Sequence, residues 1–356
     1  MAKVLMKGNE AIAEAAIRSG CRLYFGYPIT PQTEVAEYMA KRMPKVGGLC
    51  LQAESEIAAI NMVLGAAASG ARTMTSSSSP GISLKSEGIS YMAGSDVPCL
   101  ILNVQRGGPG LGGIQPAQSD YYQATKANGH GDMHLIVYAP STVQETIDLT
   151  GQAFDVGDKY RVPTMLLADG ALGQMMEPVE FSDTTVDELP EKPWAACGHG
   201  GKRKKNIINS LYIQPDELEN IVNERFERYA TIEANEVKYE EYLTDDADIV
   251  IVSFGITSRI VKTAIAQARS EGIKVGLLRP ITLWPFPSKV LEELADKTNA
   301  FLSVELSKGQ MIEDVKTATK FKKPVEFYGR TGGMLPTVDE VYGKIVEMNK
   351  KYGRNA

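Results

Sequence analysis

The chain of 356 residues is too long for one ordinary hydrophobic core and predicts two domains. Apolar residues make up 43% of it and charged residues 23%, as in soluble globular proteins, and the net charge of −6 argues against nucleic-acid binding. The absence of any apolar run near the ~18 residues of a membrane span, and of an apolar signal-peptide core, predicts a cytoplasmic protein without membrane contact.

Helix and strand patterns alternate through the first half of the chain. Helices are expected over residues 9–19, 31–43, 56–69, 82–93 and 142–155, and strands over residues 23–25, 49–52, 73–76, 99–104, 135–138 and 164–167. The last two strands are nearly continuous apolar runs, as expected for parallel strands covered on both faces. This order predicts an α/β fold with a doubly wound parallel sheet, whose ligands lie beyond the carboxyl ends of the strands.

The first of these strands runs into the turn Tyr27-Pro-Ile-Thr-Pro31. Thr30 stands where a helix N-cap is expected, with Pro31 at the first helical position and Glu34 in the first turn. A ligand carboxylate bound there would meet free N–H groups, the helix dipole and a hydroxyl. The simpler alternative is that Thr30 only caps its helix.

Polar residues also follow the next three strands. Glu54 and Glu56 precede a helix of small apolar residues, Ser76 to Ser79 precede the next helix, and Arg106 opens a glycine-rich loop. An arginine at a strand end can bind a carboxylate with two parallel hydrogen bonds, although a plain salt bridge would use the same residue. The serines could touch a ligand or simply cap their helix, and a glutamate at a helix start could serve only the helix dipole.

After residue 181 the alternation stops and later resumes. Residues 182–246 hold prolines, glycines, a basic run at 202–205 and one polar helix at about 216–229, and are predicted to be an interdomain arm. Residues 247–356 return to the α/β pattern and are predicted to form a second, smaller domain. In it Gly255 with Thr257 and Ser258 could cradle an anion at a helix start, but an ordinary capped turn is favoured.

Taken in chain order, these motifs closely resemble the α-type subunit of the 2-oxoacid:ferredoxin oxidoreductases. The segments that carry the resemblance are residues 24–34, 52–60, 70–81 and 103–110, and it extends from about Gly8 to the C-terminus. Enzymes of this family use thiamine diphosphate to convert a 2-oxo acid and CoA to acyl-CoA and CO₂ while reducing ferredoxin. The resemblance implies a pyrimidine-binding-type domain over residues 1–181 and a transketolase C-terminal-like domain over residues 247–356.

The resemblance also implies roles for single residues. Glu56 corresponds to the catalytic carboxylate that hydrogen-bonds the aminopyrimidine ring of the cofactor and so promotes loss of its C2 proton, with Glu54 as the reserve candidate. Thr30 and Arg106 correspond to the residues that hold the carboxylate of the 2-oxo acid. Further cofactor contacts are expected from Pro28 and Ile29.

Two parts of the catalytic apparatus are missing from the sequence. The Gly-Asp-Gly motif and Asn pair through which such enzymes bind Mg²⁺ and the diphosphate do not occur. The four cysteines are far apart, so no iron–sulfur cluster is expected on this chain, and they are predicted to be free core thiols. The resemblance implies a β-type partner subunit that carries the diphosphate site, Mg²⁺ and the iron–sulfur cluster. It also implies γ-type and ferredoxin-like subunits, ferredoxin as acceptor, and a dimer of hetero-oligomers.

The loop over residues 108–118 indicates a substrate class. It looks more like that of the branched-chain type, which acts on 2-oxoisovalerate (3-methyl-2-oxobutanoate), than that of the 2-oxoglutarate type, which commonly has a Pro-Ser-Thr-Gly run here. A 2-oxoglutarate enzyme and a non-catalytic scaffold subunit stay open as alternatives. A self-sufficient transketolase or decarboxylase is disfavoured because the diphosphate motif is missing.

Overall fold

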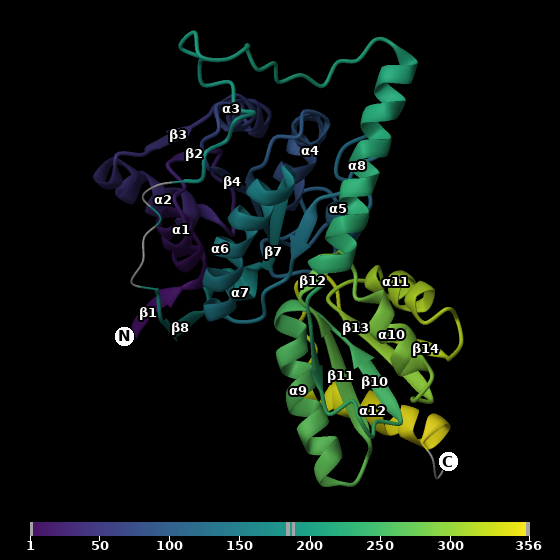
Figure 1. Cartoon of the computed structure of the whole chain (residues 1–356). Coiled ribbons are helices and arrows are strands. Elements are labelled where there is room, and N and C mark those ends of the chain that lie inside the picture. The colour runs from purple at the N-terminus through teal and green to yellow at the C-terminus, as the bar shows by residue number, and fades with distance from the viewer. Residues whose placement is uncertain (1–2, 183–185, 187–188, 354–356) are drawn as a thin grey trace.

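The computed structural model describes residues 3–182, 186 and 189–353. Figure 1 shows two α/β bodies, one above the other, with the long helix α8 (Pro215–Asn235) running down the side of the upper body to the lower one. The chain begins in the upper body and ends in the lower one.

The upper body is built on a seven-stranded sheet in the order β12-β6-β7-β5-β4-β2-β3. All pairs in it are parallel except β12, which runs antiparallel to β6. The central strands β4, β5 and β7 are buried along their whole length, as expected when helices cover both faces. The strands are β2 (Leu23–Gly26), β3 (Leu49–Gln52), β4 (Thr73–Ser77), β5 (Leu100–Gln105), β6 (Ile136–Tyr138), β7 (Thr164–Asp169) and β12 (Thr282–Trp284).

Helices pack around this sheet in two groups, with α1 against α2 and α6, and α3 against α4. A small antiparallel pair, β1 (Val4–Lys7) and β8 (Met176–Val179), joins the start of the chain to the segment that follows α7. The helices are α1 (Gly8–Arg18), α2 (Thr33–Arg42), η1 (Met43–Val46), α3 (Glu56–Ala68), α4 (Ser79–Gly94), α5 (Tyr121–Thr125), α6 (Val143–Tyr160) and α7 (Gly170–Gln174).

The lower body holds a five-stranded sheet in the order β14-β13-β10-β11-β9, in which only β9 is antiparallel to its neighbour. Helix α12 packs on α9, and α10 on α11. The strands are β9 (Tyr239–Tyr242), β10 (Ile249–Val252), β11 (Val275–Pro280), β13 (Ala300–Glu305) and β14 (Val325–Gly329), and the helices are α9 (Gly255–Ser270), α10 (Ser288–Ala295), α11 (Met311–Ala318) and α12 (Val338–Tyr352).

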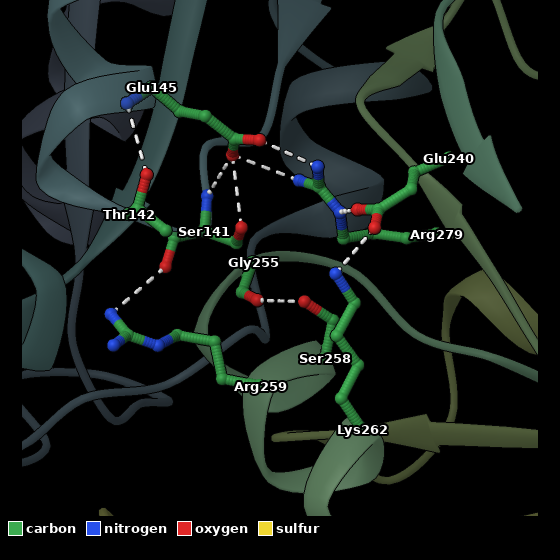
Figure 2. Close-up of polar contacts among 9 residues, drawn as sticks. All are labelled: Ser141, Thr142, Glu145, Glu240, Gly255, Ser258, Arg259, Lys262 and Arg279. Carbon is green, nitrogen blue, oxygen red and sulfur yellow. Dashed lines mark hydrogen bonds and ion pairs between the residues drawn. The ribbon is translucent and has the colours of Figure 1, made fainter. Parts of the chain in front are cut away.

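A network of charged side chains joins the two bodies (Figure 2). The buried Arg279 guanidinium binds both carboxylate oxygens of Glu145, with its Nη1 and Nη2 at 2.9 and 2.6 Å, and its Nε donates to Glu240 at 2.8 Å. Ser141 also donates to Glu145 through its N–H and its hydroxyl. Burial alone would raise the pKa of Glu145, but the hydrogen bonds and charge of Arg279 outweigh it and hold that pKa below its usual range.

Gln118 is a second link between the bodies, and it explains the Gly255 turn. Its side-chain N–H donates to the carbonyl of Phe254 (2.7 Å), and its Oε1 accepts from the hydroxyl of Thr257 (2.7 Å). The Ser258 hydroxyl donates to the carbonyl of Gly255 (2.7 Å). Both hydroxyls proposed for an anion cradle are therefore engaged within the protein, in agreement with the favoured reading of an ordinary turn.

The helices and strands expected from the sequence are all present, with ends that differ by a few residues. The additional elements are short or lie at sheet margins: β1, β8, β9, β12, β14, η1, α5, α7 and α11. The division into residues 1–181, 182–246 and 247–356 stays a prediction, and β9 and β12 each join a sheet that such a division would not assign to them.

The prediction of four core cysteines holds fully for two of them, partly for Cys50, and is wrong for Cys197. All four are free, but only Cys21 and Cys99 are buried, whereas Cys50 is partly covered and Cys197 is exposed. Cys197 lies in the arm, outside the described helices and strands, so burial of a cysteine could not be inferred from residue type alone.

Candidate active site

The candidate site lies where β2, β3, β4 and β5 end. After β2 the chain moves outward to β3 and then returns across β2 to β4, so the direction of winding reverses between β2 and β4. Doubly wound sheets bind ligands at such a reversal, because the loops that leave the two strands diverge. The structure therefore brings the four predicted segments, which follow these four strands, to one side of the sheet.

Glu56 is the first residue of α3 and is only 6% exposed. The hydroxyl of Ser55 accepts a hydrogen bond from the N–H of Ala58 (3.1 Å) and caps the helix, so Glu56 does not serve as the cap. Within the described residues the Glu56 carboxylate forms no hydrogen bond. Glu54 is exposed. Of the two candidates, only Glu56 therefore has the dry setting in which a carboxylate makes a strong hydrogen bond to a ligand.

Gly81, in the first turn of α4, allows the Glu56 side chain to lie against that helix. A Cβ atom at position 81 would stand 2.7 Å from Oε1 of Glu56 and 2.1 Å from Oγ of Ser77, so a larger residue would displace both. The hydroxyls of Ser77 and Ser78 are buried, and neither has a hydrogen-bond partner in the described part of the chain. Since buried polar groups are nearly always paired, the space beside Glu56 fits the polar groups of a ligand.

Arg106 immediately follows β5 and is 8% exposed. Its Nη1 donates to the carbonyl of Thr30 (3.0 Å) and its Nη2 to the carbonyl of Leu111 (3.3 Å), while its buried Nε has no partner in the described part of the chain. Among the described residues it has no carboxylate partner. A buried cation without a counter-charge is costly, so this guanidinium fits an anionic ligand better than it fits the predicted alternative of a salt bridge.

The N-cap prediction for Thr30 is wrong. Helix α2 begins at Thr33 with Gln32 in the N-cap position, so Pro31 is not the first helical residue. A separate turn comes first, in which the N–H of Gln32 donates to the carbonyl of Ile29 (3.1 Å), and this turn delays the helix by two residues.

The residues of this turn remain next to the site. Thr30 and Pro28 are exposed and Ile29 is partly covered, so all three can be reached from solvent. The hydrogen bond from Arg106 to the Thr30 carbonyl brings these two residues together through the main chain rather than through the threonine hydroxyl. Glu34 lies in the first turn of α2 as predicted, where it accepts hydrogen bonds from Asn9 (3.0 Å) and Gln174 (2.8 Å).

Asp120 and Asn103 support the site but were not singled out from the sequence. The Ser79 hydroxyl donates to Asp120 (2.6 Å) and accepts from the N–H of Arg106 (3.1 Å). Asn103 accepts from the N–H of Ser79 (3.1 Å) and donates to Asp120 (2.9 Å). Burial raises the pKa of Asp120, although these bonds oppose the change. An asparagine inside an otherwise apolar strand was the available signal for this network.

A cavity of about 720 Å³ opens beside the glycine-rich loop, between the two bodies. Its walls are the glycine-rich loop, the start of α4, the segment over residues 117–123, and two turns of the lower body. Glu56 and Arg106 do not line it. The lining residues are Ser79, Pro80, Ser83, Gly107, Gly108, Pro109, Gly110, Leu111, Ala117, Ser119, Asp120, Gln123, Leu306, Ser307, Lys308, Gln310, Thr331 and Gly332.

These features define a protein of the thiamine-diphosphate-binding α/β class. Residues 14–241 match the family model described as pyruvate flavodoxin/ferredoxin oxidoreductase, thiamine diphosphate-binding, and residues 247–341 match pyruvate:ferredoxin oxidoreductase core domain II. The chain belongs to this family, the 2-oxoacid:ferredoxin oxidoreductases, and is of the α type.

Curated relatives match the chain over nearly its whole length. A ketoisovalerate oxidoreductase subunit VorB of Methanothermobacter thermautotrophicus is 51% identical over 348 residues, which is 98% of each chain. A 2-oxoglutarate synthase subunit KorA of Methanothermobacter marburgensis is 36% identical and covers 96% of this chain and 98% of its own.

Solved structures agree with this assignment. A 2-oxoglutarate:ferredoxin oxidoreductase from Magnetococcus marinus, with 2-oxoglutarate, coenzyme A and succinyl-CoA bound, superposes with a TM-score of 0.85 at 29% identity. The match covers 97% of this chain and 65% of that one. A split-gene transketolase matches at 14% identity with a TM-score of 0.62 and so supports the fold alone.

The family and the α/β fold predicted from the sequence are therefore confirmed. Among the described residues, no helix is long and apolar enough to cross a membrane. In the same part of the chain, no group of three or more His, Cys, Asp or Glu side chains could hold a metal ion.

Proposed function

We propose that this chain supplies the pyrimidine half of a thiamine-diphosphate site in a complex that converts a branched-chain 2-oxo acid and CoA to acyl-CoA and CO₂, with ferredoxin as electron acceptor. The observation that carries the proposal is Glu56, a buried residue at the start of α3 whose carboxylate forms no hydrogen bond within the described residues and lies near the equally unpaired hydroxyl of Ser77. The cytoplasmic location stays a prediction from the sequence.

The residues of this chain have distinct tasks in the proposal. Glu56 accepts a hydrogen bond from the aminopyrimidine ring nitrogen and holds the proton shared between them. Arg106 binds the carboxylate of the 2-oxo acid through its guanidinium, whose buried Nε–H has no partner among the described residues, and Thr30 completes that contact. Pro28 and Ile29 contact the cofactor ring from the turn after β2. The bound cofactor supplies the electron sink for decarboxylation.

Two observations support a branched-chain substrate. Arg106 binds the carbonyl of Leu111 in a loop whose apolar side chains Leu111 and Ile114 are 84% and 58% exposed, so apolar surface is available beside the cation. The ketoisovalerate-type relative is also more similar to this chain than the 2-oxoglutarate-type relative. A 2-oxoglutarate enzyme remains the second candidate, because relatives of that type also match almost the whole chain.

The surface of α3 supports a β-type partner at this site. Apart from Glu56 and Asn61 its residues are apolar or glycine, and Ile57 in its first turn is half exposed. Leu84, on the neighbouring helix α4, is also 50% exposed. Helices that are apolar all round are usually covered, so this surface fits a subunit that would bring the diphosphate, Mg²⁺ and the iron–sulfur cluster to Glu56. Further γ-type and ferredoxin-like subunits belong to the same proposal.

The test of the catalytic role is hydrogen–deuterium exchange at C2 of thiamine diphosphate in the complex reconstituted with its native partners. Glu56→Gln keeps the shape of the side chain but removes the acid, and is expected to slow exchange by about 10²–10⁴-fold. Glu54→Gln is the matched control and should exchange at the wild-type rate. If Glu54→Gln slows the C2 exchange and Glu56→Gln does not, the catalytic glutamate is Glu54 and the assignment is displaced by two residues. If neither slows exchange, the chain is a scaffold and the proposal fails.

Substrate class is tested separately by assaying the complex with CoA, a low-potential dye and a panel of 2-oxo acids. The proposal expects the highest kcat/KM with 2-oxoisovalerate. A higher value with 2-oxoglutarate would select the second candidate.

A further inference from the structure

A second cavity, of about 280 Å³, lies where the arm and α8 meet the upper body, and the proposed function does not use it. It is close to the start of β5, since Asp96 lines it, whereas Arg106 of the candidate active site follows the end of that strand. A strand of six residues spans about 20 Å, so the two sites are separate. The charged residues that line the cavity are Asp96, Arg161, Glu224, Arg225 and Arg228.

The arginines around this cavity outnumber the carboxylates that pair with them. One oxygen of Asp96, Oδ1, accepts hydrogen bonds from Nη2 of Arg228 and from Nε of Arg225 (3.5 Å), although Arg225 is only 6% exposed. Glu224 is exposed and forms no ion pair with any residue that the structure describes. Arg161 has no carboxylate partner within the described ranges either. Because cations held away from water need a counter-charge, this cluster is suited to a further anion.

Several N–H groups at the cavity are open to a ligand. Nε of Arg228 is buried and has no hydrogen-bond partner among residues 3–182, 186 and 189–353. Arg161 donates through Nε to the carbonyl of Asp96 (3.1 Å), and its Cζ lies 4.8 Å from the centre of the Trp194 ring. Stacking occupies the face of a guanidinium and leaves its N–H edge available. Burial and the charge of Arg228 lower the pKa of Arg161, with Asp96 opposing them, as expected where cations are crowded.

A purely structural role explains only part of this arrangement. Nη2 of Arg225 donates to the carbonyl of Gly94 (3.1 Å) at the end of α4, where carbonyl groups favour a cation. This bond attaches α8 to the upper body and accounts for the burial of Arg225. It does not account for the unpaired Nε of Arg228, nor for the position of Arg161 and Arg228 at an open cavity rather than against packed side chains.

We propose that this cavity binds a small anion with a phosphate group, held by the N–H groups of Arg161 and Arg228 and by the charge of Arg225. A phosphate group carries about two negative charges near pH 7 and offers several acceptor oxygens, which suits more than one guanidinium fork. The volume is close to the lower limit of about 300 Å³ for small-molecule sites, so it fits free phosphate or a small phosphate monoester. The proposal does not depend on the proposed catalytic function.

The test is isothermal titration calorimetry of the full-length chain with inorganic phosphate, glycerol phosphate and succinate at constant ionic strength. Saturable binding of a phosphate compound is expected, with weaker binding of the dicarboxylate. The tighter of the two phosphate compounds identifies the ligand as the free ion or the monoester. Heats that do not saturate with either phosphate compound, or tighter binding of succinate, would overturn the proposal.

Variants locate the bound phosphate. Arg228→Gln should weaken its binding about 10–150-fold, the effect of losing a hydrogen bond to a charged group. Lys202→Gln removes the same charge from an exposed position of the arm that does not line the cavity, and should bind as the unmodified chain does. If Arg106→Gln loses binding while Arg228→Gln keeps it, the anion occupies the candidate active site and the proposal fails.

Glu224 provides a second variant in case Arg228→Gln does not fold. Its carboxylate is exposed and repels an anion in the cavity, so Glu224→Gln should bind the phosphate compound about 2–5-fold more tightly. Equal or weaker binding by Glu224→Gln would refute the assignment of the anion to this cavity.

Discussion

Replacing Arg279 by methionine should loosen the connection between the two bodies. The variant removes two hydrogen bonds to Glu145 in the upper body and one to Glu240 in the connecting strand, and it leaves both carboxylates without this cation. Methionine has a similar length and fills most of the same space, so the loss is chiefly one of charge and hydrogen bonding.

The size of the effect follows from the burial of the network. Removing one partner of a buried ion pair costs about 3–5 kcal/mol, and because Glu145 is partly exposed we take the lower limit of about 3 kcal/mol. An unfolding entropy of about 2.1 cal/mol/K per residue gives about 0.75 kcal/mol/K for a chain of this length. The melting temperature of Arg279→Met should therefore fall by about 4 °C. Scanning calorimetry measures this change and also shows whether the two bodies begin to melt separately.

The difference should depend on pH in a defined direction. The pKa of Glu145 is lowered in the folded protein, so its contribution to stability is present above the unfolded value of about 4.3 and is lost as pH falls through the folded value. The gap between Arg279→Met and the unmodified chain should thus be full at pH 7 and shrink below about pH 4.

Lys322→Met is the control, because it breaks only exposed ion pairs, with Asp296 (2.8 Å) and Glu292 (3.7 Å), and should leave the melting temperature unchanged within error. Equal melting temperatures for Arg279→Met and the unmodified chain would refute the reasoning.

Three other outcomes are expected. Arg106→Lys keeps the charge but loses the planar fork, so kcat/KM for the 2-oxo acid should fall by about 10–150-fold, mainly through KM; unchanged kinetics would identify Arg106 as purely structural. Burial, assisted by the charge of Lys126, lowers the pKa of His134 in the folded protein. Stability is therefore lost as pH falls below the unfolded-state value of about 6.5, and His134→Phe should lessen the loss between pH 7 and pH 5 in denaturation curves. Iodoacetamide should label Cys197 well before Cys21 and Cys99, as mass spectrometry of the native chain can show, and equal labelling would contradict the described burial.

The sequence was informative where one strong local pattern coincides with one element. The continuous apolar strand at residues 164–167 and the small apolar helix after Glu56 were located correctly, because the strand is buried along its whole length and the helix consists almost entirely of apolar residues. The sequence was uninformative where contacts with distant segments determine whether an element forms. Strand β12 has three residues and exists only because β6 lies beside it, and no local periodicity marks so short a segment.

The candidate site also has residues that the sequence could indicate and features that only the fold determines. Glu56 and Arg106 could be proposed from residue type and position, and their burial, with the Nε of Arg106 unpartnered among the described residues, supports these proposals. The start of α2 could not be predicted, since Thr30 and Pro31 form a good helix-start sequence and only the turn closed by Gln32 displaces it. The full burial of Lys85 on α4 was also not predicted, because the sequence does not tell a buried lysine from the many lysines that lie on helix surfaces.

The placement of β12 has a consequence for how the protein is made. During synthesis the upper sheet cannot be completed when residue 181 leaves the ribosome, because its last strand is translated about a hundred residues later. Until then β6 presents unpaired N–H and C=O groups that could pair with another nascent chain. A truncated gene that stops at the arm would make this exposure permanent. The two bodies are therefore not separable modules, and recombination between related genes at the arm would disturb the sheet unless β12 came from the same parent.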